Sequence, residues 1–168
     1  MIKTHDRPAL RRRRYIPSKY LASLAIIITG AMLGLSPAYA EPAKLDLAAY
    51  KGKVVYLDFW ASWCGPCKAS FPYMERLKAT YGRDGLVIIA VNVDHAQAKA
   101  ENFLKAQQSD LAVVYDPKGE IATAYNVKDM PTSVLIGRDG KVRYVHKGFF
   151  PDQTEAYGRQ VEALLHEK

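Results

Sequence analysis

The chain holds two cysteines, Cys64 and Cys67, separated by Gly65 and Pro66. Two thiols at this spacing can close a small disulfide ring and reopen it, or they can supply two ligands to a soft metal ion. A ring this short constrains little chain entropy, so a disulfide here would add little stability as a structural cross-link. The pair is therefore a better candidate for redox chemistry than for a purely structural role.

The elements around the pair place the first sulfur at the start of a helix. The apolar run Val54–Trp60 predicts a buried strand, and apolar residues at helical spacing predict a helix over 68–81. A helix N-terminus offers unpaired N–H groups and a partial positive charge, and both lower the pKa of a nearby thiol. We expect Cys64 to be a solvent-accessible nucleophile, with Gly65 permitting a tight turn and Pro66 starting the helix.

Apolar and amphipathic runs alternate along the rest of the chain. Asp94 is expected to cap a second helix, and Asp152 with Glu155 to form a capping box for a final helix that ends near Leu165. That final helix should pack on the sheet through Ala156, Val161, Leu164 and Leu165. Further strands are predicted over 86–93, 111–115, 132–137 and 141–148, and further helices over 95–108 and 120–127. This order predicts an α/β fold, a three-layer α/β/α sandwich with a mixed central sheet.

The charge of the chain is concentrated at its N-terminus. Residues 1–40 hold seven of the 24 Lys and Arg and one of the 17 Asp and Glu, so residues 41–168 carry 17 basic and 16 acidic residues. A body with a net charge of +1 gives no reason to expect nucleic-acid binding. The basic stretch precedes an uncharged apolar run over 20–35 and then Ala38 and Ala40, the pattern of a signal peptide over 1–40. An uncleaved anchor and a twin-arginine signal are the alternatives.

The segment "DFWASWCGPCKASFP" resembles the active-site segment of the thioredoxin superfamily. With the export signal and the long insert "DHAQAKAENFLKAQQSDLAVVYDPKG", the chain resembles the exported TlpA/ResA-like branch over residues 45 to 165. The resemblance implies a thioredoxin-like domain over 41–168 with a TlpA-type αβ insert. The matching positions are Asp58, Trp63, Cys64, Cys67, Pro72 and the run Met130, Pro131 and Thr132.

The resemblance also assigns roles to these residues. Asp58 would be a buried carboxyl of raised pKa that exchanges a proton with Cys67. Pro131 would be a cis-proline, and the Met130 backbone beside it would pair with a segment of the substrate near Cys64. The implied catalytic residues are Cys64, Cys67, Asp58 and Pro131, and the implied substrate-binding residues are Trp63, Gly65, Pro66, Met130 and Thr132.

Three features depart from the ResA-like pattern, and one is the presence of Asp58, because ResA-like proteins often lack this buried carboxyl. A glutamate commonly stands three residues after the second cysteine in that branch, and here the position is Ser70. The extra N-terminal hairpin of the family is expected to be shortened to "LDLAAYKGK". The presence of Asp58 makes the site more thioredoxin-like than its export class suggests, so a glutamate-tuned mechanism is not carried over.

The resemblance implies a periplasmic thiol-disulfide oxidoreductase that works as a monomer with no cofactor beyond the Cys64–Cys67 disulfide. Its partners would be disulfide-bearing exported proteins, such as apocytochrome c or copper-site assembly proteins, and a membrane protein that donates electrons. The main alternative is a Cu(I) or Zn module in which His95 or His146 completes the ligand set, although no second Cys-x-x-Cys exists. A thiol peroxidase is a second alternative, but the residues before Cys64, "FWASW", include no Thr or Pro.

Overall fold

The computed structural model describes residues 45–167, so the predicted signal peptide lies outside the described residues. These residues form one five-stranded sheet in the order β3-β2-β1-β4-β5. Strands β1, β2 and β3 run parallel, whereas β4 is antiparallel to both β1 and β5. The predicted mixed sheet is confirmed. The strands are β1 (Val54–Trp60), β2 (Leu86–Asn92), β3 (Ala112–Tyr115), β4 (Thr132–Ile136) and β5 (Val142–Lys147).

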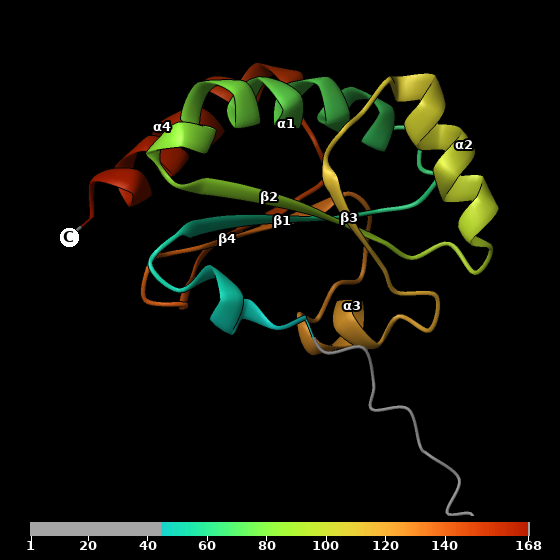
Figure 1. The fold of residues 1–168 in the computed structure, drawn as a ribbon. Coiled ribbons are helices and arrows are strands. Elements are labelled where there is room, and N and C mark those ends of the chain that lie inside the picture. The colour runs from blue at the N-terminus through green and yellow to red at the C-terminus, as the bar shows by residue number, and fades with distance from the viewer. Residues whose placement is uncertain (1–44, 168) are drawn as a thin grey trace, which may run out of the picture. The chain divides into compact units, whose positions relative to one another are not determined.

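Helices cover both faces of the sheet, which confirms the three-layer arrangement (Figure 1). The long helices α1 (Cys67–Tyr81), α2 (Gln97–Gln107) and α4 (Thr154–His166) lie on one face. The opposite layer is thin, because it consists of α3 (Glu120–Ala124) and the 3-10 helix η2 (Leu47–Tyr50). Two further 3-10 turns flank these helices. The turn η3 (Gly82–Asp84) follows α1, and the turn η4 (Pro151–Gln153) precedes α4.

Alternation along β1 divides the core into two halves and decides which way Asp58 faces. Side chains of successive strand residues point to opposite faces of a sheet. Tyr56 and Trp60 belong to the core cluster that contains α1 and α4, whereas Leu57 and Phe59 belong to the cluster under α3. Asp58 is in step with Tyr56 and Trp60, so its carboxyl lies on the face that carries both cysteines.

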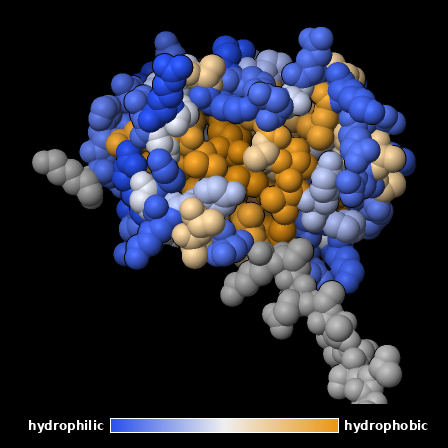
Figure 2. All heavy atoms as spheres, viewed as in Figure 1, coloured by the Kyte–Doolittle hydropathy of each residue, from blue (hydrophilic) through white to orange (hydrophobic). Residues whose placement is uncertain are grey.

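Strand β3 forms a short, apolar edge of the sheet. It pairs only with Ile89–Asn92 of β2, so the first part of β2 has no neighbour on that side. Figure 2 shows apolar atoms gathered in the middle of the view, surrounded by hydrophilic side chains. The half-buried apolar residues along this edge are Val87, Val113 and Val114.

The predicted cap of α2 is wrong. The N-cap of α2 is Ala96, and no side chain caps this helix. The Asp94 carboxylate turns away from the helix and accepts hydrogen bonds from Ser62 and from the Asn92 side chain. A contact with a residue 32 positions earlier in the chain therefore outcompetes the local cap.

The start of α4 also differs from the prediction. Asp152 and Glu155 form no capping box, because a 3-10 turn precedes the helix and its N-cap is Gln153, which makes no side-chain cap. The predicted contact through Ala156 is replaced by Tyr157, which is buried in the core, while Ala156 is only half buried. The predicted packing of Val161, Leu164 and Leu165 is confirmed.

Ahead of β1, the described residues contain only the 3-10 helix η2 and no strand. The expected shortening of the N-terminal hairpin stays a prediction, because residues 1–44 lie outside the described part of the chain. Among residues 45–167, no helix has both the length and the apolar character that a membrane crossing requires.

Candidate active site

The two cysteines form a disulfide at the head of α1. Cys67 is the first residue of the helix, and its backbone N–H donates to the Cys64 sulfur at 3.3 Å. The Cys64 sulfur therefore lies where the unpaired N–H groups of the helix point. A negative charge is stabilised at this place, so on reduction Cys64 is the cysteine whose thiolate the fold favours.

The two cysteines differ in how far they are buried. Cys64 is 4% exposed and Cys67 is 0% exposed, while the neighbouring Trp63 is 70% exposed. Cys64 is less open than the sequence suggests, because it packs in the core cluster beside Trp60 and Ala61. An approaching molecule nevertheless meets Cys64 first, and Cys67 lies behind it.

The reason predicted for Gly65 is wrong. Its φ does not lie in the left-handed region, and a Cβ at this position would meet nothing within 4 Å. The turn itself therefore does not require glycine. The open space over Gly65 keeps the surface beside the disulfide low. Pro66 serves as the N-cap of α1 with φ −61°, in accord with its predicted place at the helix start.

A buried carboxylate holds the loop that leads to Cys64. Asp94 accepts from the Ser62 backbone N–H at 2.8 Å, the Ser62 hydroxyl at 2.9 Å and the Asn92 side-chain amide at 2.9 Å. The Cys64 N–H donates to the Ala61 carbonyl at 3.0 Å. These hydrogen bonds of Asp94 were not predicted from the sequence. The one signal for them was the presence of two polar residues, Asn92 and Asp94, at the end of a buried apolar run.

Asp58 is fully buried, and its side chain lies on the face of the sheet that carries the cysteines. Its Oδ1 accepts a hydrogen bond from the Ser133 hydroxyl at 2.7 Å, and Ser133 in turn accepts one from the Tyr56 hydroxyl at 3.0 Å. Burial raises the pKa of Asp58 to about 7, and the hydrogen bond from Ser133 opposes part of that rise. The carboxyl can therefore gain and lose a proton near neutral pH.

The loop before β4 contributes a stretch of backbone whose hydrogen-bonding groups are not all used. The Met130–Pro131 peptide bond is cis, as the resemblance implies. Phe59 pairs with Thr132, so Pro131 lies at the end of β1 from which the cysteine loop departs. The Pro131 carbonyl accepts from Gly148 N–H at 2.7 Å, whereas no hydrogen bond among residues 45–167 uses the Met130 N–H or C=O.

Two neighbouring side chains complete the local structure. The Thr132 hydroxyl donates to the Asp129 carbonyl at 2.7 Å and so closes the turn around Pro131. Ser70, at the position where the ResA-like branch commonly has glutamate, is buried and donates to the Cys67 carbonyl at 3.0 Å. Ser70 supplies no carboxyl to the site. Asp58 is therefore the carboxylic acid that the site offers.

The comparison with known families agrees with this geometry. The Redoxin family model matches residues 27–161. The chain belongs to the Redoxin family. A relative named thiol-disulfide oxidoreductase ResA, from Bacillus thuringiensis subsp. konkukian, is 39% identical over 122 residues, which is 72% of this chain and 70% of that protein. The ResA of Bacillus subtilis is also 39% identical, over 62% of this chain and 59% of its own length.

Solved structures extend the match to the fold of this Redoxin-family chain. A protein assigned as the thiol:disulfide interchange protein DsbE of Chlorobium tepidum superposes with a TM-score of 0.69 at 48% identity. The superposition covers 71% of this chain and 84% of that one. The chain is thus a thiol-disulfide oxidoreductase of the TlpA/ResA type with a thioredoxin-like fold.

The two histidines considered as metal ligands make other contacts in this Redoxin-family fold. His95 is exposed, and its Nδ1 lies 2.8 Å from the Pro117 carbonyl. His146 is half buried on β5, where its ring stacks on Tyr157 and its Nε2 lies 2.7 Å from Gln160 Oε1. Burial lowers the pKa of His146, and its buried Nδ1 has no hydrogen-bond partner within residues 45–167. In the described part of the chain, no three His, Cys, Asp or Glu side chains gather as a metal site.

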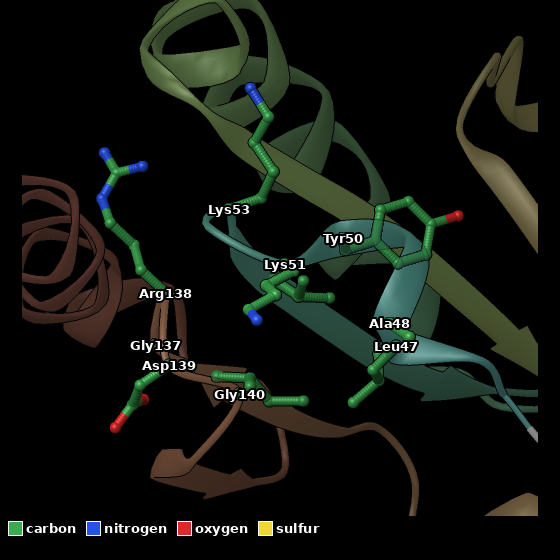
Figure 3. A pocket seen from close by; sticks show the side chains of 11 residues that line it. Leu47, Ala48, Tyr50, Lys51, Lys53, Gly137, Arg138, Asp139 and Gly140 are labelled. Carbon is green, nitrogen blue, oxygen red and sulfur yellow. The ribbon is translucent and has the colours of Figure 1, made fainter.

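A hollow of about 250 Å³ lies at the other end of β1, between η2 and the β4–β5 turn (Figure 3). Its charged side chains include Lys53 and Arg138, which point away from its centre in Figure 3. The Arg138 guanidinium donates to the carbonyls of Gly52 and Leu165 at 2.7 and 2.8 Å, so it ties the β4–β5 turn to the chain before β1 and to α4. The charged side chain of Arg138 at this hollow therefore has a structural role. The hollow lies apart from the disulfide.

Proposed function

We propose that the protein reduces disulfides in exported client proteins, with Cys64 as the attacking thiolate and Cys67 as the resolving thiol. The observation that carries this proposal is the asymmetry at the head of α1. Cys64 is the outer sulfur and accepts an N–H from the helix end, whereas Cys67 is fully buried. The buried carboxyl of Asp58 lies on the same face of the sheet as Cys67 and titrates near neutral pH.

The reaction follows as two exchanges. The Cys64 thiolate attacks one sulfur of the client disulfide, and the other client sulfur leaves as a thiolate that takes a proton from solvent. Cys67 then passes its proton to the Asp58 carboxylate and attacks the Cys64 sulfur. The second client sulfur leaves and is protonated, so the client gains two electrons and two protons while Cys64 and Cys67 become a disulfide.

Client recognition would use the rim around Cys64. The free N–H and C=O of Met130 can form strand-like hydrogen bonds with an extended client segment, the mode by which many domains take up a peptide at a backbone edge. Trp63 offers an exposed apolar surface on the other side of the disulfide. The low surface over Gly65 lets the client backbone approach. Pro66 is exposed and would complete this rim, whereas Thr132 is buried and would contribute by closing the turn around Pro131.

Several features support the reducing direction and a site of action outside the cytosol. The Gly65-Pro66 insert resembles that of thioredoxin, whose potential is about −270 mV. The pattern over 1–40 predicts an export signal, and a solved neighbour at 34% identity and TM-score 0.62 is described as an exposed lipoprotein thioredoxin of Streptococcus pneumoniae. Reduced protein would be regenerated by the dithiol of a membrane protein, and clients would be apocytochrome c or copper-site assembly proteins.

The test is a trapping experiment with Cys67→Ser. The reduced variant is mixed with an oxidised peptide that carries a Cys-x-x-Cys-His haem-attachment motif, and the products are separated without reductant and identified by mass. Cys67→Ser should accumulate a peptide adduct on Cys64 that dithiothreitol releases. Cys64→Ser should form no comparable adduct.

Two results would count against the scheme. An equal adduct on Cys64→Ser would mean that Cys64 is not the attacking cysteine. The absence of any adduct on either variant would rule out the proposed reaction with the client. A separate measurement of the Cys64–Cys67 reduction potential decides the direction, because a value near −120 mV is that of a strong oxidant.

A further inference from the structure

The Asp58 carboxyl is held at only one of its two oxygens. Asp58 on β1 is paired in register with Ser133 on β4, and the Ser133 hydroxyl lies 2.7 Å from Oδ1. The Tyr56 hydroxyl lies 3.0 Å from the Ser133 oxygen. All three side chains are buried, and Oδ2 has no hydrogen-bond partner within residues 45–167.

The chemistry of these groups fixes the direction of both hydrogen bonds. An ionised carboxylate can only accept, so Ser133 donates its single hydrogen to Asp58. Ser133 then has only lone pairs left for Tyr56, so Tyr56 donates to Ser133. Burial, reinforced by the negative charge of Asp58, raises the pKa of Tyr56 well above its ordinary value, so Tyr56 keeps the hydrogen that this arrangement needs.

We propose that Tyr56 and Ser133 are positioning residues that anchor Asp58 through Oδ1, present Oδ2 to the proton of Cys67, and set the pH range of the resolving step. This inference rests on the proposed function, because it assigns Asp58 the proton of Cys67. It adds two residues that the Cys-x-x-Cys segment does not contain and that touch neither sulfur through any described hydrogen bond.

Among the groups on this face, Ser133 is the one that acts directly on the Asp58 carboxyl. The titratable neighbours are Cys67 and Tyr73 from α1, Tyr157 from α4, and His146 on β5, whose backbone pairs with Ser133. No lysine or arginine in the described part of the chain forms an ion pair or hydrogen bond with Asp58. Ser133 is the one side chain there that donates to it, and this donation lowers the pKa that burial raises.

The experiment is an infrared titration of the full-length oxidised protein, with Asp58→Asn as the blank. The absorption of a protonated carboxyl, measured against the blank, gives the midpoint of Asp58, which is expected at about pH 7 in the wild type. Ser133→Ala removes a hydrogen bond to a charged group, so its midpoint should rise by about one to two pH units. Tyr56→Phe should raise it by less, because it only weakens the donor.

Two further variants separate positioning from general disturbance of the core. Ser133→Thr keeps the hydroxyl and should restore a midpoint near that of the wild type. Tyr73→Phe removes a buried tyrosine hydroxyl on the same face, one that donates to the Thr154 carbonyl and does not contact Asp58, so its midpoint should stay at the wild-type value. Thermal unfolding checks that each variant is folded.

A kinetic measurement connects the carboxyl to the sulfur. Reduced protein is mixed with an excess of an aromatic disulfide such as Ellman's reagent in a stopped-flow instrument. The first aromatic thiolate released reports attack by Cys64, and the second reports resolution by Cys67. Ser133→Ala should shift the pH profile of the second phase upwards by the same amount as the carboxyl midpoint and leave the first phase unchanged.

The outcomes separate this inference from the function beneath it. Unshifted midpoints in both Ser133→Ala and Tyr56→Phe, or an equal shift in Tyr73→Phe, would overturn the positioning role. If this happened while Cys67→Ser still trapped the peptide, the proposed function would stand. A shifted midpoint without any change in the second phase would show that Asp58 does not take the proton of Cys67, which also overturns the inference.

Discussion

Replacing Asp58 by asparagine should stabilise the oxidised protein at neutral and alkaline pH. The substitution keeps the size of the side chain and an oxygen that can accept from Ser133, but removes the buried negative charge. The pKa of Asp58 rises from its ordinary 3.8 to about 7 on folding. Each unit corresponds to about 1.4 kcal/mol, so ionised Asp58 lowers the free energy of unfolding by about 4 kcal/mol.

The sign of the pH dependence follows from proton binding. Between pH 4 and pH 7 the folded state holds a proton on Asp58 that the unfolded state has lost, so wild-type stability falls as pH rises through this window. Asp58→Asn has no such group and should lack this fall. The two proteins should therefore be similar in stability near pH 4, and the variant should be more stable by up to about 4 kcal/mol at pH 8.

The assay is urea unfolding of the oxidised proteins at several pH values from 4 to 8, followed by tryptophan fluorescence and circular dichroism. Asp94→Asn is the matched control, because Asp94 is also a buried carboxyl but receives three hydrogen bonds from N–H and O–H donors. It should destabilise the protein. A stability difference between wild type and Asp58→Asn that is the same at pH 5 and pH 8 would refute the reasoning, since no proton would then be linked to folding at this site.

Two substitutions at the rim should separate client binding from stability. Trp63→Ala removes a side chain that is 70% exposed, so urea unfolding should change by less than about 0.5 kcal/mol while the rate of insulin-disulfide reduction falls several-fold. An unchanged rate would remove Trp63 from the client surface. Gly65→Ala adds a methyl group where nothing lies within 4 Å, so melting temperature should be retained and client reduction slowed. A large loss of stability in Gly65→Ala would show that the turn needs glycine after all.

The elements that depend on local pattern could be predicted from the sequence. Strand β1 is a run of seven residues that are all buried, and its predicted and observed limits coincide. The helix after the cysteines begins at Cys67, directly after Pro66, the residue expected to start it. These features were accessible because the periodicity of apolar residues reports which side of an element is buried.

The features that depend on contacts between distant residues could not be predicted. Asp94 precedes a helix, as a cap would, but its partner Ser62 belongs to a loop that only the folded sheet brings near. Ser133 is separated from Asp58 by 75 positions, and only the antiparallel register of β1 and β4 makes them neighbours. Nothing in the sequence around Ser133 distinguishes it from an ordinary strand residue.

The buried carboxyl shares its face of the sheet with tightly packed aromatic side chains. A charge in the interior costs stability that must come from elsewhere in the fold. On the same face, Trp60 packs against Phe71 and Phe103 with ring centroids 4.9 and 4.8 Å apart, and all three side chains are almost fully buried. Burying such large aromatic groups contributes several kcal/mol each, which is enough to offset a cost of about 4 kcal/mol at Asp58. An acid that titrates near neutral pH requires a dry environment, so the same packing that compensates for Asp58 also gives it the pKa that the proposed resolving step would use.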